Sequence, residues 1–147
     1  MNTRRQILTR SVGLAGALWL RPASAAGDDL AAAVAAFAAG VPVRAGRVVL
    51  DVAPLVENGN AVPTTVSVES PMSAADHVQA IAIFNERNPQ RDVAVFRLGP
   101  RAGRAVVGTR IRFATSQQLV AVAKMSDGSC WSHAIDVIVT LAACIEA

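Results

Sequence analysis

The sequence of 147 residues is poor in the residue types that most often carry chemistry. It has two cysteines, two histidines and no tyrosine, and aromatic residues make up only 4% of it. It lacks a Cys-x-x-Cys-His motif, a glycine-rich phosphate loop and a Gly-x-Ser-x-Gly motif, which argues against haem attachment, nucleotide binding and serine hydrolysis. We therefore expect no enzyme active site, no metal site and no other cofactor in this chain.

The N-terminus has the pattern of an export signal. Residues 3–8, Thr-Arg-Arg-Gln-Ile-Leu, are followed by an apolar stretch over 11–20 and by the A-x-A cleavage pattern of Ala23-Ser24-Ala25. About ten apolar residues are too few to span a bilayer, which takes about 20. We predict a twin-arginine signal peptide over 1–25, a periplasmic location, and a mature chain without a membrane anchor.

The basic character of the whole sequence comes from this leader. The chain has 14 basic residues and a net charge of +3, but four of the arginines lie before residue 26, which leaves ten basic against eleven acidic residues. A nucleic-acid partner would require a basic face, so we expect none. The pattern favours a solvated strand face for five later arginines, and less strongly a docking surface for an anionic partner: Arg97, Arg101, Arg104, Arg110 and Arg112.

The mature chain begins with a predicted helix. Asp28 and Asp29 precede an alanine-rich segment that ends before Gly40, which is the order of an acidic start, a helical interior and a glycine stop. Leu30, Val34 and Phe37 fall on one face at helical spacing. We expect this face to pack against the rest of the domain.

The remainder of the chain alternates between valine- and isoleucine-rich runs and turn residues. This pattern predicts an all-β fold, an immunoglobulin-like antiparallel β-sandwich of about seven strands, which together with the helix occupies residues 26–141. Residues 142–147 are predicted to form a flexible C-terminal arm. The predicted strands are 46–52, 62–69, 77–85, 93–98, 105–114, 118–126 and 130–141.

The two cysteines are badly placed for a disulfide within the chain. Cys130 begins the last predicted strand and Cys144 follows it by 14 residues, which span roughly 45 Å when extended, whereas a bridge needs Cα atoms about 5.5 Å apart. Cys130, beside Trp131, is expected to be an inert, partly buried residue. It is not expected to form a metal pair with His133, because residues three apart on a strand point to opposite faces. His77 and His133 are interpreted as ordinary strand residues.

Cys144 lies beyond the last predicted strand, in the tail Ala142-Ala143-Cys144-Ile145-Glu146-Ala147. Chain ends reach outward unless they are tied down, and the three residues from Leu141 to Cys144 span about 10 Å at full extension. This thiol is therefore the candidate site, available to another protein. Glu146 and the terminal carboxylate place negative charge beside it, which favours the thiol over the thiolate.

Several segments of the chain resemble the SoxY family of sulfur carriers. The resemblance implies an immunoglobulin-like sandwich that pairs with SoxZ, a second small β-sandwich subunit. It also implies that the C-terminal cysteine, here Cys144, covalently holds the substrate sulfur, while separate periplasmic sulfur-processing enzymes and cytochromes act on it. The segments that carry it are residues 46–51, 57–63, 66–72, 75–78 and 123–129, with Trp131.

The chain departs from that family around the cysteine. The family ends in Gly-Gly-Cys-Gly-Gly, whereas Ala142 and Ala143 precede Cys144 here, and Ile145 and Glu146 follow it. This matches a variant branch with an AACIE arm. The bulkier arm leaves two alternatives open. The chain could be a non-catalytic binding or assembly subunit of a periplasmic redox system in which Cys144 is incidental, or a redox protein that uses Cys144 for intermolecular disulfides.

Overall fold

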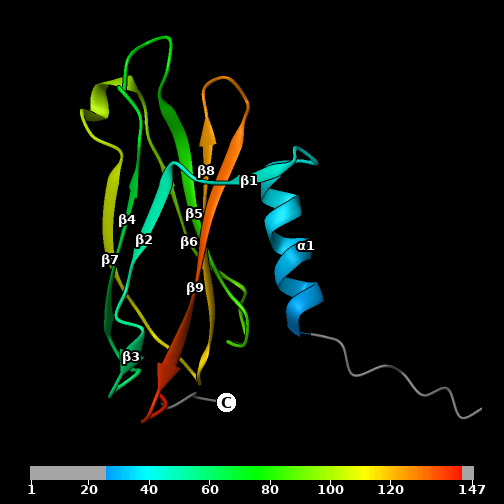
Figure 1. Ribbon diagram of the computed structural model, residues 1–147, viewed down its shortest axis with the longest axis vertical. Coiled ribbons are helices and arrows are strands. Elements are labelled where there is room, and N and C mark those ends of the chain that lie inside the picture. Colours follow the sequence, from blue (N-terminus) through cyan, green and yellow to red (C-terminus); the bar gives the residue numbers. More distant parts are fainter. Residues whose placement is uncertain (1–25, 144–147) are drawn as a thin grey trace, which may run out of the picture.

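The structure, a computed structural model, describes residues 26–143, and they form two β-sheets packed face to face with one helix outside them (Figure 1). Each sheet combines strands from both halves of the chain. The elements in chain order are α1 (Ala26–Ala38), β1 (Val43–Ala45), β2 (Val48–Asp51), β3 (Leu55–Val56), β4 (Val62–Val68), β5 (Val78–Asn85), β6 (Asp92–Arg97), the 3-10 helix η1 (Pro100–Ala102), β7 (Val106–Ile111), β8 (Gln117–Met125) and β9 (Cys130–Val139).

The predicted β-sandwich is confirmed, with nine strands among the described residues instead of seven. The larger sheet has the order β1-β9-β8-β5-β6, with β3 also paired to β9, and the smaller sheet has the order β2-β4-β7. All seven predicted strands are present. The two additional strands, β1 and β3, are three and two residues long and pair in parallel with opposite ends of β9. The larger sheet is therefore mixed, whereas the sequence pattern predicts a purely antiparallel one.

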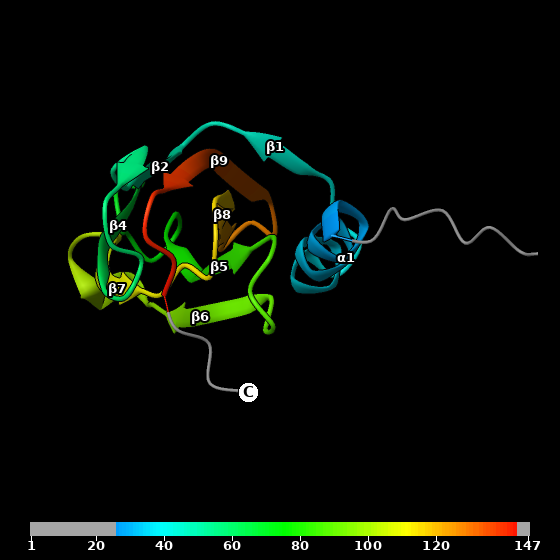
Figure 2. The same ribbon diagram turned by 90° about the horizontal axis from the view of Figure 1, so that it is seen from below.

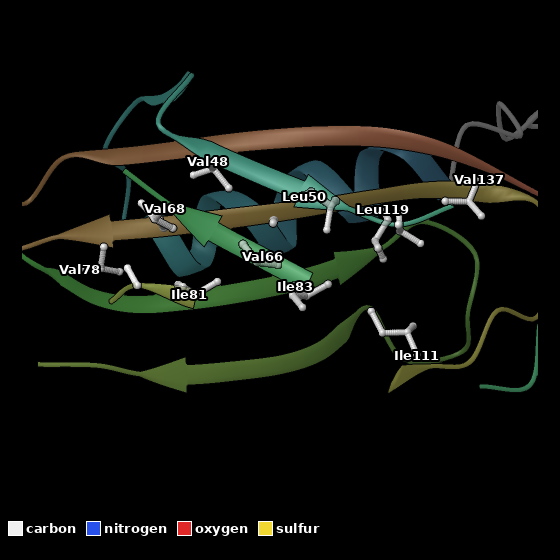
Figure 3. Close-up of a cluster of buried hydrophobic side chains, with 14 of the residues drawn as sticks. Val48, Leu50, Val66, Val68, Val78, Ile81, Ile83, Ile111, Leu119 and Val137 are labelled. Atoms are coloured by element: carbon white, nitrogen blue, oxygen red, sulfur yellow. The ribbon is translucent and has the colours of Figure 1, made fainter. Parts of the chain in front are cut away.

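The main core fills the space between the two sheets (Figure 3). Alternate residues of β4 point inward, so that Val66 is fully buried against the larger sheet, in which Ile81 and Leu119 are also fully buried. Phe113, just beyond β7, is the largest side chain in this core and is 0% exposed. Burial of such side chains is the main stabilising contribution to a domain of this size.

The helix covers the outer face of the larger sheet, beside β5 and β8 (Figure 2). Leu30, Val34 and Phe37 face this sheet, as predicted, and the Phe37 ring meets that of Phe84 edge to face at 5.9 Å. Because a helix covers one face of β5 and the smaller sheet the other, nearly every residue of β5 is buried. Within the described residues, no helix has the length and apolarity needed to cross a membrane.

The helix ends as the glycine signal predicted. Gly40 (φ 79°) donates its N–H to the carbonyl of Ala35 at 3.3 Å, and Ala39 (φ 52°) donates to that of Ala36 at 3.2 Å. This is the pattern of a Schellman stop in which Ala39 is the left-handed residue and Gly40 follows it. At the other end α1 begins at Ala26, so Asp28 and Asp29 lie in its first turn. There they face the partial positive charge of the helix N-terminus, and Asp29 pairs with Arg91 at 3.3 Å.

Candidate functional site at the base of the C-terminal arm

The last strand carries the chain to one end of the sandwich, next to β3 (Figure 1). After β9 ends at Val139, the chain stays paired with the segment after β3. Thr140 donates its N–H to the carbonyl of Val56 at 3.0 Å, and Leu141 donates to that of Glu57 at 3.1 Å. The parallel pairing of β3 with β9 therefore continues through Leu141, two residues beyond the strand.

The next two residues differ in burial. Ala142 is exposed, but Ala143 is only 5% exposed and donates its N–H to the carbonyl of Phe113 at 3.0 Å. The sequence predicts an arm that starts at Ala142. The structure shows that the chain is held against the body as far as Ala143, so any outward reach is counted from Ala143 and not from Leu141.

The remaining predicted site residues, Cys144, Ile145 and Glu146, lie outside the described residues, and their roles stay predictions. The last residue that the structure describes is Ala143, directly before the candidate thiol. Bond geometry places the Cα of Cys144 about 3.8 Å from that of Ala143. The candidate site is thus located at the end of the sandwich formed by the end of β9, the turn after β3 and the segment after β7.

The second cysteine is buried more completely than the sequence predicted. Cys130 has a free thiol, is 1% exposed, and begins β9 at the end opposite the arm. Burial raises the pKa of this thiol, because a low-dielectric environment disfavours the thiolate. The ten residues of β9 are extended from Cys130 onward, which places the arm at the far end of the strand. Cys130 is therefore poorly suited to nucleophilic chemistry.

The histidines are not arranged as metal ligands. His133 is exposed on β9 while Cys130 is buried on it, as expected for residues three apart on a strand. Nδ1 of His133 accepts the backbone N–H of Leu50 at 2.9 Å. His77 lies just before β5 and not in a strand, and its Nδ1 is 3.0 Å from the carbonyl oxygen of Ser73. Within residues 26–143, no three His, Cys, Asp or Glu side chains are grouped so that they could hold a metal ion.

The arginines expected on a solvated face are exposed, namely Arg97, Arg101, Arg104, Arg110 and Arg112. The three ion pairs found within residues 26–143 use other arginines. Arg112 directly precedes Phe113, the residue that binds Ala143, so an exposed cation lies close to the arm base. Glu57, which binds Leu141 through its carbonyl, is also exposed and adds a negative charge at the same end.

The residues that hold the base of the arm were not predicted. Residues 57–63 are one of the segments that carry the family resemblance, and Phe113 falls in the predicted strand 105–114. Gly59 in fact donates its N–H to the carbonyl of Leu141 at 2.9 Å and accepts the N–H of Phe113 at 2.8 Å. No pattern within a single segment reveals such a junction, because it joins three distant parts of the chain.

These features define a class: a small β-sandwich whose candidate reactive cysteine follows the last strand in the sequence. The sequence profile of a family described as "Sulfur oxidation protein SoxY" matches residues 33–144. The chain therefore belongs to the SoxY family. This match includes Cys144 and confirms the resemblance drawn from the sequence.

Solved structures agree with this assignment. The chain is similar to the sulfur carrier protein SoxY from Chlorobium limicola f thiosulfatophilum, with 28% identity, a TM-score of 0.66, and coverage of 78% of this chain and 99% of that one. A superoxide reductase (neelaredoxin) from Ignicoccus hospitalis matches at 17% identity and a TM-score of 0.57, over 64% of this chain and 80% of that one. A superoxide reductase from Nanoarchaeum equitans matches at 10% identity and a TM-score of 0.55, over 65% of this chain and 100% of that one. The two reductases share the fold alone. No curated protein sequence matches this chain.

Proposed function

We propose that this protein is a covalent sulfur carrier that presents a substrate sulfur on Cys144 to periplasmic sulfur-oxidising enzymes. The observation that carries the proposal is the position of Ala143, the residue before Cys144, at one end of the sandwich, while the other thiol is buried at the opposite end of β9. Membership of the SoxY family and the similarity to a sulfur carrier protein support it. In this role the protein performs no catalysis, and the enzymes act on the sulfur that it holds.

The simplest loading reaction needs no oxidant. The Cys144 thiolate attacks a terminal sulfane sulfur of an inorganic polysulfide, a new S–S bond forms, the adjacent S–S bond of the polysulfide breaks, and the shortened polysulfide dianion leaves. The protein then carries a persulfide anion, so charge and electrons balance. A thiol near a chain end can react in this way, whereas Cys130 is shielded by the core.

We further propose that the carrier works as a heterodimer with a SoxZ-like β-sandwich subunit. The described surface exposes several large apolar side chains, among them Val49, Leu55 and Ile138, each more than half exposed. Apolar side chains on several strands of a small domain suit a protein partner. Export by the twin-arginine route, with residues 1–25 as the signal, would place this subunit in the periplasm, where it would meet its partner.

Intact-mass spectrometry tests the carrier role directly. Protein purified from the periplasm without reductant should carry adducts heavier by whole sulfur atoms or oxidised-sulfur groups, and dithiothreitol should remove those that are persulfide or disulfide linked. Incubation with sodium polysulfide should add sulfur to the reduced protein. Cys144→Ser should abolish both results, and Cys130→Ser should leave both intact.

Adducts that map to Cys130 would overturn the carrier proposal. So would sulfur-dependent growth that is undiminished with Cys144→Ser. Either outcome would favour the alternative of a non-catalytic assembly subunit in which Cys144 is incidental.

A further inference from the structure

Gly59 occupies the centre of a junction between three segments that are distant in the sequence. Its N–H donates to the carbonyl of Leu141 at 2.9 Å, and its carbonyl accepts the N–H of Phe113 at 2.8 Å. The carbonyl of Phe113 in turn accepts the N–H of Ala143 at 3.0 Å. We call these three backbone hydrogen bonds the arm junction. They join the turn after β3, the segment after β7 and the base of the arm.

The arm junction leaves no room for a side chain at position 59. A Cβ atom there would lie 2.5 Å from the carbonyl oxygen of Phe113, 3.2 Å from the backbone nitrogen of Ala143 and 3.2 Å from Cγ1 of Val139. The first contact is with a backbone atom, so relief requires the backbone itself to move. The φ angle of Gly59 is not among the positive values of the described glycines, so this position needs glycine for space and not for conformational freedom.

The atoms that a side chain would displace belong to the arm and its immediate support. Phe113 holds Ala143, Val139 ends the strand that leads into the arm, and Ala143 directly precedes Cys144. By contrast, a Cβ at Gly108, in β7, would meet only Oγ1 of Thr65 at 3.9 Å, an ordinary contact. The two glycines therefore form a matched pair, one within the arm junction and one in a strand nearby.

We propose that Gly59 is a positioning residue for the carrier arm. Because it lacks a side chain, the arm junction can close, and the closed junction fixes the point from which Cys144 leaves the body. This inference rests on the proposed function of Cys144, and it adds a defined origin and a defined reach to the arm.

The reach follows from covalent geometry. With Ala143 held, the sulfur of Cys144 stays within about 7 Å of the Ala143 Cα. If the junction opened and the chain were released back to Val139, the five residues up to Cys144 could extend about 17 Å. A closed junction therefore requires a sulfur-processing enzyme to place its reactive centre close to this end of the sandwich.

Distances between spin labels test the proposal without any partner enzyme. A nitroxide is attached to Cys144, the buried Cys130 remaining unlabelled, and a second nitroxide to Arg101→Cys, an exposed position on η1 at the far end of β7. The parent protein should give a narrow distribution of distances. Gly59→Ala should broaden it and increase the mobility of the Cys144 label, whereas Gly108→Ala should change neither.

Hydrogen exchange distinguishes positioning from a general loss of stability. In Gly59→Ala the amides of Leu141 and Ala143 should exchange at least roughly tenfold faster, while amides in the β8–β9 ladder keep their protection. If Gly59→Ala does not fold, Ala143→Pro provides the second variant, because it removes the N–H that binds Phe113 at a position outside every strand of the described residues. It should broaden the distance distribution in the same way.

An unchanged distance distribution and unchanged amide exchange in Gly59→Ala would overturn the proposal, as would equal effects from Gly108→Ala. Neither measurement requires sulfur on Cys144. Failure of the carrier function would therefore appear only in the mass-spectrometry experiment, and failure of the positioning role only here.

Discussion

His133 accepts the backbone N–H of Leu50 through Nδ1 at 2.9 Å, and this bond connects β9 of the larger sheet to β2 of the smaller one. It lies on the open side of β9 between the short strands β1 and β3, which pair with the two ends of β9. The His133 side chain therefore connects the two sheets at a place where no strand pairing does.

Replacement of His133 should therefore weaken the sandwich. His133→Leu leaves the N–H of Leu50 without this acceptor, and we expect the free energy of unfolding to fall by about 1–2 kcal/mol. Urea denaturation measures the change. His133→Gln, whose amide oxygen can accept the same N–H, should recover part of the loss. Equal losses in both variants would show that the hydrogen bond contributes nothing.

Asp127 should make the stability of the protein depend on acidity. Oδ1 of Asp127 accepts both the hydroxyl of Ser129 at 2.6 Å and its backbone N–H at 2.9 Å, and these bonds hold the pKa of Asp127 below its ordinary value of 3.8. A lowered pKa means that the folded state favours the carboxylate. The resulting stabilisation is complete above the unfolded pKa and disappears as the pH falls through the folded pKa.

Asp127→Asn should accordingly lower the melting temperature at pH 7 but change it progressively less as the pH falls below about 4. Thermal melts of both proteins between pH 2.5 and pH 7 provide the comparison. A difference in melting temperature that is constant, or that grows towards acid, would contradict the assignment.

The charges around the arm base should tune the reactivity of Cys144 in opposite directions. The bond between Phe113 and Ala143 places the Cα of Arg112 within about 10 Å of the Ala143 nitrogen. Glu57 binds Leu141, three residues before Cys144. At about 10 Å in water a unit charge contributes about 0.4 kcal/mol, or roughly a factor of two in the thiolate fraction.

Arg112→Gln should slow the reaction of Cys144 with a disulfide reagent by up to about twofold at low salt, and Glu57→Gln should accelerate it by a similar factor. Stopped-flow absorbance at fixed pH measures both rates. The differences should vanish in about 1 M salt, where the Debye length is only about 3 Å. Effects of the same sign in both variants would exclude a Coulombic origin.

The exposed apolar pair on β3 and β9 should cause self-association when the chain is expressed alone. Leu55 and Ile138 are paired in register and are 59% and 58% exposed. We expect concentration-dependent oligomers of the unpartnered chain in analytical ultracentrifugation. The double variant Leu55→Lys with Ile138→Lys should shift the population towards monomer, whereas Thr65→Lys, on an exposed polar position of β4, should not. A parent chain that is monomeric at every concentration would refute this expectation.

Much of the fold could be predicted because it depends on local patterns. The alternation in β4, the nearly continuous apolar runs of β5 and β8, and the glycine stop of α1 are each visible in a short window of sequence. β1 and β3 were not predicted, because strands of three and two residues are too short to show an alternation of apolar and polar residues. Their parallel pairing with β9 depends on tertiary contacts alone.

The candidate site could be predicted only in part for a related reason. Cys144 is conspicuous because it lies beyond the last apolar run. The burial of Ala143, however, depends on Phe113 and Gly59, which are 30 and 84 residues away in the sequence. The local sequence around Ala143 gives no sign that its amide is bound, so the binding of Ala143 to Phe113 could not be predicted.

The position of β9 within its sheet has a mechanical consequence. A force on the arm reaches β9 through Val139, and its component along the strand acts on a β9 that is paired with β8 over most of its length and with β1 and β3 on its other side. Because the ladder hydrogen bonds lie across the strand, such a force loads many of them together in shear instead of opening them one at a time. The strand that leads to the arm is thus held on both sides and can bear such a force without unravelling the domain.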